Sequence, residues 1–183
     1  MPLRALIFAL LLALSPAAAR AALKAGDPAP DFSIEAAEGG KDFTFHLAEA
    51  LKKGPVVLYF YPKSFTSVCT VEAHEFAEAM EDFAAANASV IGVSSDTIET
   101  QREFSKKECR DKFPVGADPD FHVIKAYDAA FSIPIKGPVF ADRLTYVIAP
   151  DGKILYAYSD ASAHNHIVNA LAVVRKWRES QAK

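Results

Sequence analysis

Tyr59-Phe60-Tyr61-Pro62-Lys63-Ser64-Phe65-Thr66-Ser67-Val68-Cys69-Thr70 is the stretch around which the rest of the chain is organised. It completes an apolar run that begins at Val56 and stops at a proline. A continuous apolar run is typical of a strand covered on both faces, so we place this strand centrally in a sheet. A polar turn follows, and one of the two cysteines of the chain stands where a helix is expected to begin.

The residues after this turn have helical periodicity to about residue 86, with Phe76, Met80 and Phe83 on one stripe. If Thr66 is the N-cap, Cys69 is the third residue of the first turn, where a capping box usually has an acid. The unpaired N–H groups and the positive end of the helix dipole favour a thiolate there. From placement alone, Cys69 is either an activated nucleophile or an inert buried thiol.

The flanking segments alternate between strand and helix patterns. A second buried strand is expected at Ser89–Ser94, followed by a helix that runs to about Cys109 or Arg110. Residues 132–142, rich in proline and glycine, are expected to form a loop. Two strand-like runs, 143–148 and 153–158, flank Asp151-Gly152 and predict a hairpin, and an amphipathic helix closes the chain. The pattern predicts an α/β fold with a mixed central sheet and helices on both faces.

Composition favours one folded domain in a chain of 183 residues, because 51% hydrophobic residues are enough for a core. The formal net charge is −3, and the basic residues are dispersed. The chain therefore lacks the basic patch that is typical of nucleic-acid binding.

Residues 1–21 have the pattern of a signal peptide, and residues 22–183 form the expected mature domain. Arg4 precedes an apolar run, and Ala19-Arg20-Ala21 fits the cleavage rule. The run is shorter than the ~20 residues that a spanning helix needs, so no stable membrane association is expected. The segment predicts export, with the periplasm as destination.

A metal site and a cofactor are not expected. The chain has no Cys-x-x-Cys pair, and two thiols alone do not make a structural zinc site. His164 and His166 are two residues apart, so on a helix they point apart, and both are expected to face solvent.

Pro62 to Cys69 resembles the P-x-x-x-T-x-x-C motif of the peroxiredoxins, in the AhpC/TSA superfamily. The likeness continues through Thr70-Val71-Glu72, as in the group called bacterioferritin comigratory protein or peroxiredoxin Q. It also covers residues 26–32, 90–94 and 143–148, and so nearly all of the mature chain. The resemblance implies a thioredoxin-like fold.

The resemblance also implies a role for each matching residue. Cys69 would be the peroxidatic cysteine, which attacks a peroxide and becomes a sulfenic acid. Thr66 would hydrogen-bond the thiolate and the peroxide, and Pro62 would shield the thiol from water. Arg143 would hold the thiolate ionised, as a rigid fork of donors suits an oxyanion. Glu72 is a candidate for orienting Arg143.

Cys109 is the other cysteine and the candidate resolving thiol. Some members of the group carry that thiol five residues after the first, where this chain has His74, and others place it in the later helix, where Ser105 has the more familiar position. At about 140° around the helix from Phe104, Cys109 is expected to be reachable, with nearby basic residues favouring its thiolate. It is a resolving cysteine, a bystander, or half of a structural disulfide with Cys69.

The implied activity is a thiol-dependent peroxidase that reduces hydrogen peroxide and organic hydroperoxides with a thioredoxin-like reductant, in a monomer. A thiol-disulfide oxidoreductase is disfavoured because the chain lacks Cys-x-x-Cys. The remaining alternative is a non-catalytic thioredoxin-like module with a structural Cys69–Cys109 disulfide.

Overall fold

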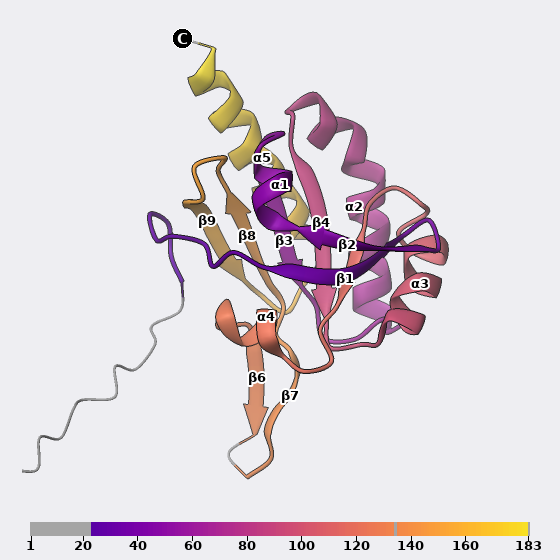
Figure 1. Cartoon of the computed structure of the whole chain (residues 1–183). Coiled ribbons are helices and arrows are strands. Elements are labelled where there is room, and N and C mark those ends of the chain that lie inside the picture. The colour runs from indigo at the N-terminus through magenta and orange to yellow at the C-terminus, as the bar shows by residue number, and fades with distance from the viewer. Residues whose placement is uncertain (1–22, 134, 183) are drawn as a thin grey trace, which may run out of the picture.

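The computed structural model describes residues 23–133 and 135–182. The expected signal peptide, residues 1–21, lies outside this part of the chain, as does Ala22. Figure 1 shows how strands and helices follow one another. In chain order the elements are β1 (Ser33–Glu38), β2 (Lys41–His46), α1 (Leu47–Leu51), β3 (Val56–Phe60), α2 (Ser67–Ala85), β4 (Ser89–Ser94), α3 (Ile98–Lys107), β5 (Val115–Ala117), α4 (His122–Ala126), β6 (Ala130–Ile133), β7 (Gly137–Ala141), β8 (Leu144–Ile148), β9 (Ile154–Ser159) and α5 (His164–Gln181).

Within the described residues, seven strands form one sheet in the order β2-β1-β5-β4-β3-β8-β9. β3 pairs in parallel with β4 and antiparallel with β8, while β4 is parallel to β5. Every residue of β3 is buried, as its unbroken apolar sequence requires. The prediction of a mixed sheet with this strand inside it is confirmed.

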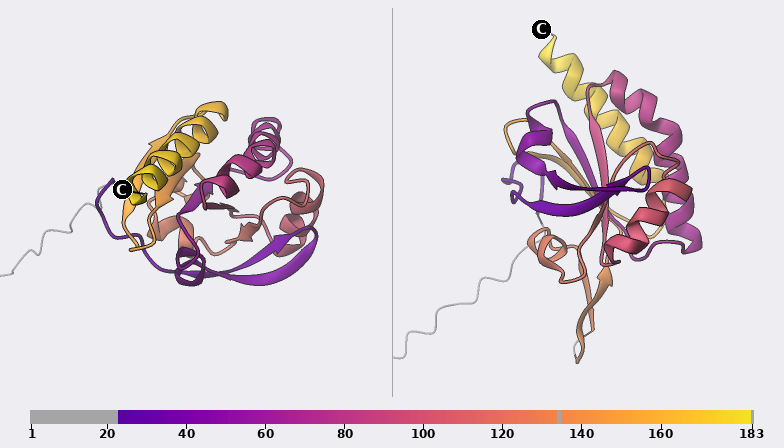
Figure 2. Two further views of the ribbon diagram at one scale, coloured as in Figure 1. Left: turned by 90° about the horizontal axis from the view of Figure 1, so that it is seen from above. Right: turned by 45° about the vertical axis from the view of Figure 1, so that its right-hand side comes forward.

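Helices cover both faces of the sheet, as predicted. Side chains of a strand alternate between its faces, and β3 divides its residues between two apolar clusters. Val56, Leu58 and Phe60 face the cluster that includes α1 and α4. Val57 and Tyr59 face the cluster that includes α2, α3 and α5. Figure 2 shows α2 and α5 side by side over this second face.

The predicted hairpin around Asp151-Gly152 is confirmed as β8 and β9, which pair antiparallel. The prediction of a loop at residues 132–142 is wrong, because β6 and β7 pair antiparallel there. Phe131 and Phe140 stack across this second hairpin, with ring centroids 4.6 Å apart. The proline and glycine signals therefore mark its turn and edges and do not exclude strands. In Figure 1 this hairpin projects from the body of the domain.

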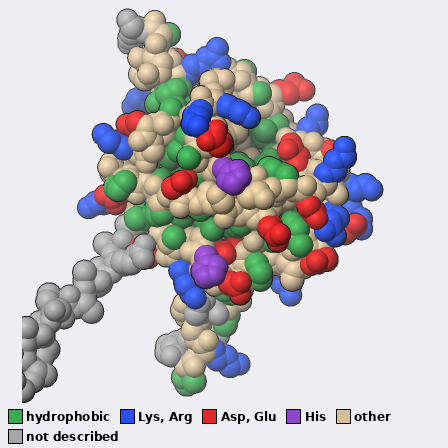
Figure 3. Space-filling model, in the orientation of Figure 1, with side chains coloured by type: hydrophobic (Ala, Val, Ile, Leu, Met, Phe, Trp, Pro, Cys, Tyr) green, Lys and Arg blue, Asp and Glu red, His purple; other side chains and the backbone are tan. Residues whose placement is uncertain are grey.

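No helix within residues 23–133 and 135–182 has both the length and the hydropathy needed to cross a membrane. On the face seen in Figure 3, acidic and basic side chains are interspersed.

Candidate active site

The turn between β3 and α2 carries three of the predicted site residues. Thr66 is the N-cap of α2, so Cys69 is the third residue of the helix, as predicted. Phe65, just before the cap, has a positive φ of 62°, which turns the chain into the helix. Cys69 is only 2% exposed, whereas Pro62 is half-buried and Thr66 is exposed.

The hydroxyl of Thr66 donates a hydrogen bond to the carbonyl oxygen of Lys63 at 2.9 Å. Within the described chain it makes no side-chain capping bond. The N-cap position is thus confirmed, but the side-chain half of the predicted capping box is not formed. Because the hydroxyl proton is already donated, the oxygen of Thr66 is left to act as an acceptor.

A buried polar network fixes this turn to the neighbouring strand and helix, and the local sequence does not predict it. The Ser64 N–H donates to Asp96 Oδ2 at 2.7 Å. The Tyr61 hydroxyl donates to Gln101 Oε1 at 2.7 Å. Gln101 is completely buried, and its Nε2 donates to Ser94 Oγ at 2.7 Å. A glutamine in the first turn of a helix gives no local signal of such burial.

Arg143, one residue before β8, brings three parts of the chain together at Cys69. Its Nη2 donates to Cys69 Sγ at 3.4 Å, and its Nη1 donates to the carboxyl group of Glu72. Its Nε donates to the Ala161 carbonyl at 3.1 Å. Cys69 and Glu72 are three residues apart on α2 and therefore share one helix face. The structure thus brings Arg143, Glu72 and Cys69 together.

The charges of this group are set by burial. Burial raises the pKa of Glu72 to about 8, although Arg143 opposes the rise. For Arg143, burial alone would lower the pKa, but Glu72 and Cys69 outweigh it and raise the pKa. Arg143 is therefore a fixed cation that is shared between a thiol and a carboxyl group.

Tyr59 belongs to the same buried apolar cluster as Cys69. Its ring stacks on Phe76, with centroids 4.4 Å apart, and a Cβ at Gly92 would lie 2.6 Å from the Tyr59 ring. Among the described residues, the Tyr59 hydroxyl and Glu72 Oε1 are buried without a hydrogen-bond partner. Burial raises the pKa of Tyr59 far above its usual value, and Cys109 and Glu72 add to the rise.

Cys109 does not lie where the sequence analysis placed it. α3 ends at Lys107, so Cys109 belongs to the turn that follows and not to the helix. Its N–H donates to the Phe104 carbonyl at 3.1 Å, and the next two residues, Arg110 and Asp111, both have positive φ. This turn carries the Cys109 side chain into the core, where it is completely buried.

The prediction that Cys109 is reachable is therefore wrong, because it assumed that the helix continues. The expectation that basic neighbours favour its thiolate is also wrong. Burial raises the pKa of the Cys109 thiol well above its usual value, and Glu108 raises it further. Cys69 and Cys109 are both free thiols in this structure.

The histidines correct a second expectation. His164 is exposed, as predicted, and pairs with Glu75 at 3.0 Å. His166, expected to face solvent, is completely buried. Its Nδ1 lies 2.8 Å from Thr145 Oγ1, and its Nε2 lies 3.1 Å from the Asp160 carbonyl oxygen. The two histidines do point apart, as their spacing on the helix predicts, but His166 points into the core.

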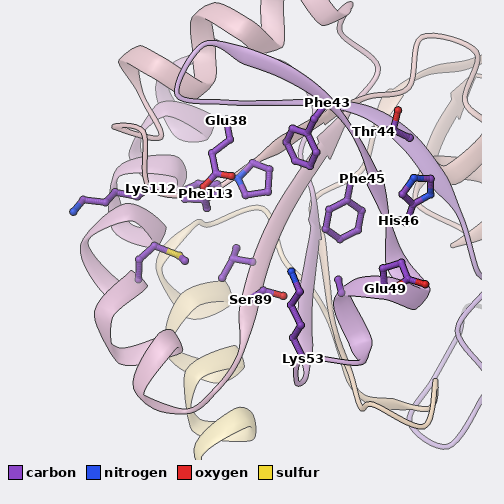
Figure 4. A pocket seen from close by; sticks show the side chains of 14 residues that line it. Glu38, Phe43, Thr44, Phe45, His46, Glu49, Lys53, Ser89, Lys112 and Phe113 are labelled. Atoms are coloured by element: carbon purple, nitrogen blue, oxygen red, sulfur yellow. The ribbon is translucent and has the colours of Figure 1, made fainter.

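A shallow groove of about 420 Å³ lies beside the first turns of α2 and is lined by residues that include Val68, Val71 and Ala161. A second pocket, of about 370 Å³, lies between β2, α1 and α2 and contains none of the predicted site residues. Figure 4 shows Phe43, Phe45 and Lys53 among the side chains that line it. Only the first groove adjoins the helix turn that carries Cys69.

Metal ligands do not gather in the described part of the chain, where no group of three or more His, Cys, Asp or Glu side chains is placed to hold an ion. The site itself brings together a thiol, a fixed cation and a carboxyl group.

Known proteins resemble this chain over most of its length. The model of the AhpC/TSA family matches residues 25–157. Peroxiredoxin Bcp of Escherichia coli K12 is 32% identical over 162 residues, covering 87% of this chain and 98% of that protein.

Solved structures give the same result. The crystal structure of peroxidoxin BcpB from Mycobacterium tuberculosis superposes with a TM-score of 0.76 at 32% identity, covering 84% of this chain and 97% of that one. Peroxiredoxin Q of Xanthomonas campestris has a TM-score of 0.69 at 26% identity, covering 79% and 91% of the two chains. These matches confirm the thioredoxin-like fold. The chain therefore belongs to the AhpC/TSA family, among the peroxiredoxins, which are thiol-dependent peroxidases.

Proposed function

We propose that Cys69 is the peroxidatic thiol of this peroxiredoxin and that Arg143 activates it. The observation that carries the proposal is the hydrogen bond from Arg143 Nη2 to Cys69 Sγ at 3.4 Å. A cation held beside a buried sulfur favours its thiolate, and the thiolate is the nucleophilic form of cysteine. The position of Cys69 in the first turn of α2 adds the positive end of the helix dipole.

In the first step the Cys69 thiolate attacks the terminal oxygen of hydrogen peroxide or an organic hydroperoxide. An S–O bond forms and the O–O bond breaks, so that sulfur is oxidised to sulfenic acid and the peroxide is reduced. The leaving alkoxide or hydroxide takes up a proton and departs as alcohol or water. Arg143 stabilises the charge that moves from sulfur to oxygen. Thr66, whose oxygen is free to accept, orients the peroxide O–H, and Pro62 shields the thiol from water.

In the second step Cys109 resolves the sulfenic acid. Its thiol condenses with Cys69–SOH to give a disulfide and one water, and a thioredoxin-like dithiol then reduces the disulfide by exchange. The support is that Cys109 is the other cysteine of the chain and shares one apolar cluster with Cys69. Because Cys109 is completely buried, this step requires the turn at residues 108–112 to open.

Two cysteine variants and dimedone, which traps sulfenic acids, test this scheme. Cys69→Ser should abolish peroxide consumption, whereas Cys109→Ser should keep the first step and accumulate a Cys69 sulfenic acid that dimedone labels. With a dithiol protein as reductant, Cys109→Ser should lose steady-state turnover. Peroxide consumption by Cys69→Ser at the parent rate would overturn the role of Cys69. Unchanged turnover of Cys109→Ser would overturn resolution by Cys109.

The proposal also covers the cellular location and the oligomeric state of the protein. Residues 1–21 are a signal peptide that directs the chain to the periplasm, and the mature domain is a monomer. The sequence pattern of Arg4 and the apolar run that follows supports export. Fractionation of expressing cells and sequencing of the mature N-terminus test the first statement, with Ala22 expected as the first residue. Light scattering of the mature protein tests the second.

A further inference from the structure

His166 is a buried polar residue beside the candidate site, and neither proposed step uses it. It lies in the first turn of α5 and is completely buried. The Asp160 carbonyl, 3.1 Å from Nε2, only accepts hydrogen bonds, so Nε2 carries the hydrogen. Nδ1 then accepts from the Thr145 hydroxyl at 2.8 Å. These two partners hold His166 in one neutral tautomer.

Two short connections lead from His166 to Arg143. Thr145 is the second residue of β8, and Arg143 stands just before this strand. Both side chains lie on the face of the sheet that α2 and α5 cover, because Arg143 contacts Glu72 of α2 and Thr145 bonds to His166 of α5. Asp160 precedes Ala161, whose carbonyl accepts the hydrogen bond from Arg143 Nε at 3.1 Å. His166 thus contacts both β8, which follows Arg143, and the loop whose Ala161 carbonyl accepts the hydrogen bond from Arg143 Nε.

The loop needs such an anchor because its residues are exposed from Asp160 to Ser162. Asp160 also binds the Ser162 N–H at 2.8 Å, a contact inside the loop that cannot fix it to the domain. The bond from His166 to the Asp160 carbonyl ties the same loop to α5. The Ala161 carbonyl then offers Arg143 a fixed acceptor.

We propose that His166 is a positioning residue of the peroxidase reaction: through the Asp160 carbonyl and Thr145 it holds Arg143 in the orientation that places Nη2 on Cys69 Sγ. The proposal rests on the proposed roles of Cys69 and Arg143 and adds a residue that touches neither the thiol nor the peroxide.

The surroundings of His166 agree with a neutral role. The titratable groups that face it are Arg143 just before β8, Tyr158 of β9 and Asp160, with Glu72 of α2 beyond Arg143. Burial lowers the pKa of His166 and the charge of Arg143 adds to the fall, and together they outweigh the opposing effect of the Asp160 carbonyl and carboxylate. A neutral imidazole positions Arg143 without competing with it for Glu72 or for the Cys69 thiolate.

The test compares His166→Leu with His166→Gln, because the glutamine amide keeps a donor for the Asp160 carbonyl and leucine does not. In His166→Leu the rate constant with hydrogen peroxide should fall about tenfold, the size expected for one lost hydrogen bond. The pH dependence of Cys69 alkylation by iodoacetamide should move to higher pH in the same variant. His166→Gln should restore both values to within about threefold of the parent.

His122→Leu is the matched control, since His122 is an exposed histidine at the start of another helix. It should leave the rate constant and the alkylation profile unchanged. Parent-like values of both in His166→Leu, whether or not its unfolding midpoint falls, would overturn the proposal.

If His166→Leu does not fold, Thr145→Val decides, because valine keeps the shape of the buried threonine and removes its hydroxyl. A slower peroxide reaction and an alkylation profile moved to higher pH support the proposal, and parent values of both overturn it. A failure of the proposed role of Cys69 would give a different result. In that case Cys69→Ser would still consume peroxide, whatever the His166 variants do.

Discussion

The two cysteines of this chain lie in one apolar cluster, but their polar surroundings are opposite. Cys69 accepts a hydrogen bond from Arg143 and stands in the first turn of a helix. Cys109 follows the end of a helix, and burial and the carboxylate of Glu108 raise the pKa of its thiol. One thiol is buried beside a cation, and the other beside apolar side chains and an anion.

In the proposed scheme, this difference means that the folded state supports only the first half of the reaction cycle. Cys69 can react where it stands, because the charge that develops on oxygen meets a fixed guanidinium. Cys109 is completely buried with a raised pKa, so it becomes a nucleophile only when its turn opens. The two residues with positive φ, Arg110 and Asp111, place backbone strain in the turn that has to open.

The largest expected effect tests the cation side of the comparison. Arg143→Gln removes the charge beside Cys69, and the rate constant with hydrogen peroxide should fall by about 10²–10³, the usual cost of removing a transition-state donor. Stopped-flow mixing with peroxide measures it. Arg102→Gln, which removes a half-buried arginine paired with Asp42, should leave the rate unchanged. A fall of less than threefold in the rate constant of Arg143→Gln would mean that Arg143 does not activate Cys69.

The next effect compares the two thiols directly. In the folded protein at pH 7, iodoacetamide should label Cys69 at least ~100-fold faster than Cys109, because only the opened turn exposes the second thiol. Peptide mass spectrometry after short labelling times measures both rates in one sample. In strong denaturant the ratio should fall to within a few-fold. Similar rates in the folded protein would show that burial does not separate the two thiols.

The sequence predicts the Cys69 side of this comparison better than the Cys109 side, for a physical reason. The buried strand, the turn and the N-cap are encoded in consecutive residues, so Thr66 and Cys69 could be placed by local rules. Arg143 and Glu72 came from the family resemblance, and their contact forms between distant segments. The strand patterns likewise predicted the mixed sheet but missed β6 and β7, whose turn signals were read as a loop.

The errors at Cys109 and His166 have one origin. Both predictions assume an ideal helix, and neither includes the tertiary contacts that each residue makes with the rest of the domain. α3 stops at Lys107 and the chain turns inward, while His166 finds partners in Thr145 and the Asp160 carbonyl. Helix ends and buried polar partners depend on tertiary contacts, so periodicity alone does not predict them.

A smaller effect concerns Glu72, whose pKa burial raises to about 8 from its usual value near 4.5. A carboxyl group with a raised folded-state pKa stabilises the fold fully below the unfolded value and loses that contribution as pH rises through the folded one. Glu72→Gln mimics the protonated acid and removes this dependence. Relative to the parent, the free energy of unfolding of Glu72→Gln should therefore increase between pH 4.5 and 8, by about 1 kcal/mol or more.

Urea unfolding at several pH values measures this difference. Glu81→Gln, on the exposed side of the same helix, serves as the control and should show a constant difference from the parent. A constant difference for Glu72→Gln as well would mean that Glu72 stays ionised beside Arg143 throughout this range, and the site would then hold a carboxylate together with the thiolate.

The smallest effect tests which contacts keep the turn around Cys109 closed. His74 of α2 pairs with Glu108 at 2.7 Å, and Arg110 pairs with Glu78 of the same helix at 3.1 Å, so both sides of the turn are tied to the helix of Cys69. Such pairs contribute up to about 1 kcal/mol each. His74→Ala should therefore raise the labelling rate of Cys109 by about two- to fivefold while leaving that of Cys69 unchanged.

His46→Ala, which removes a histidine paired with Ser33 on β1, is the control and should change neither rate. If His74→Ala behaves like that control, the contact between His74 and Glu108 does not contribute to the cost of opening, and the apolar packing of Cys109 together with the remaining Arg110–Glu78 pair sets that cost.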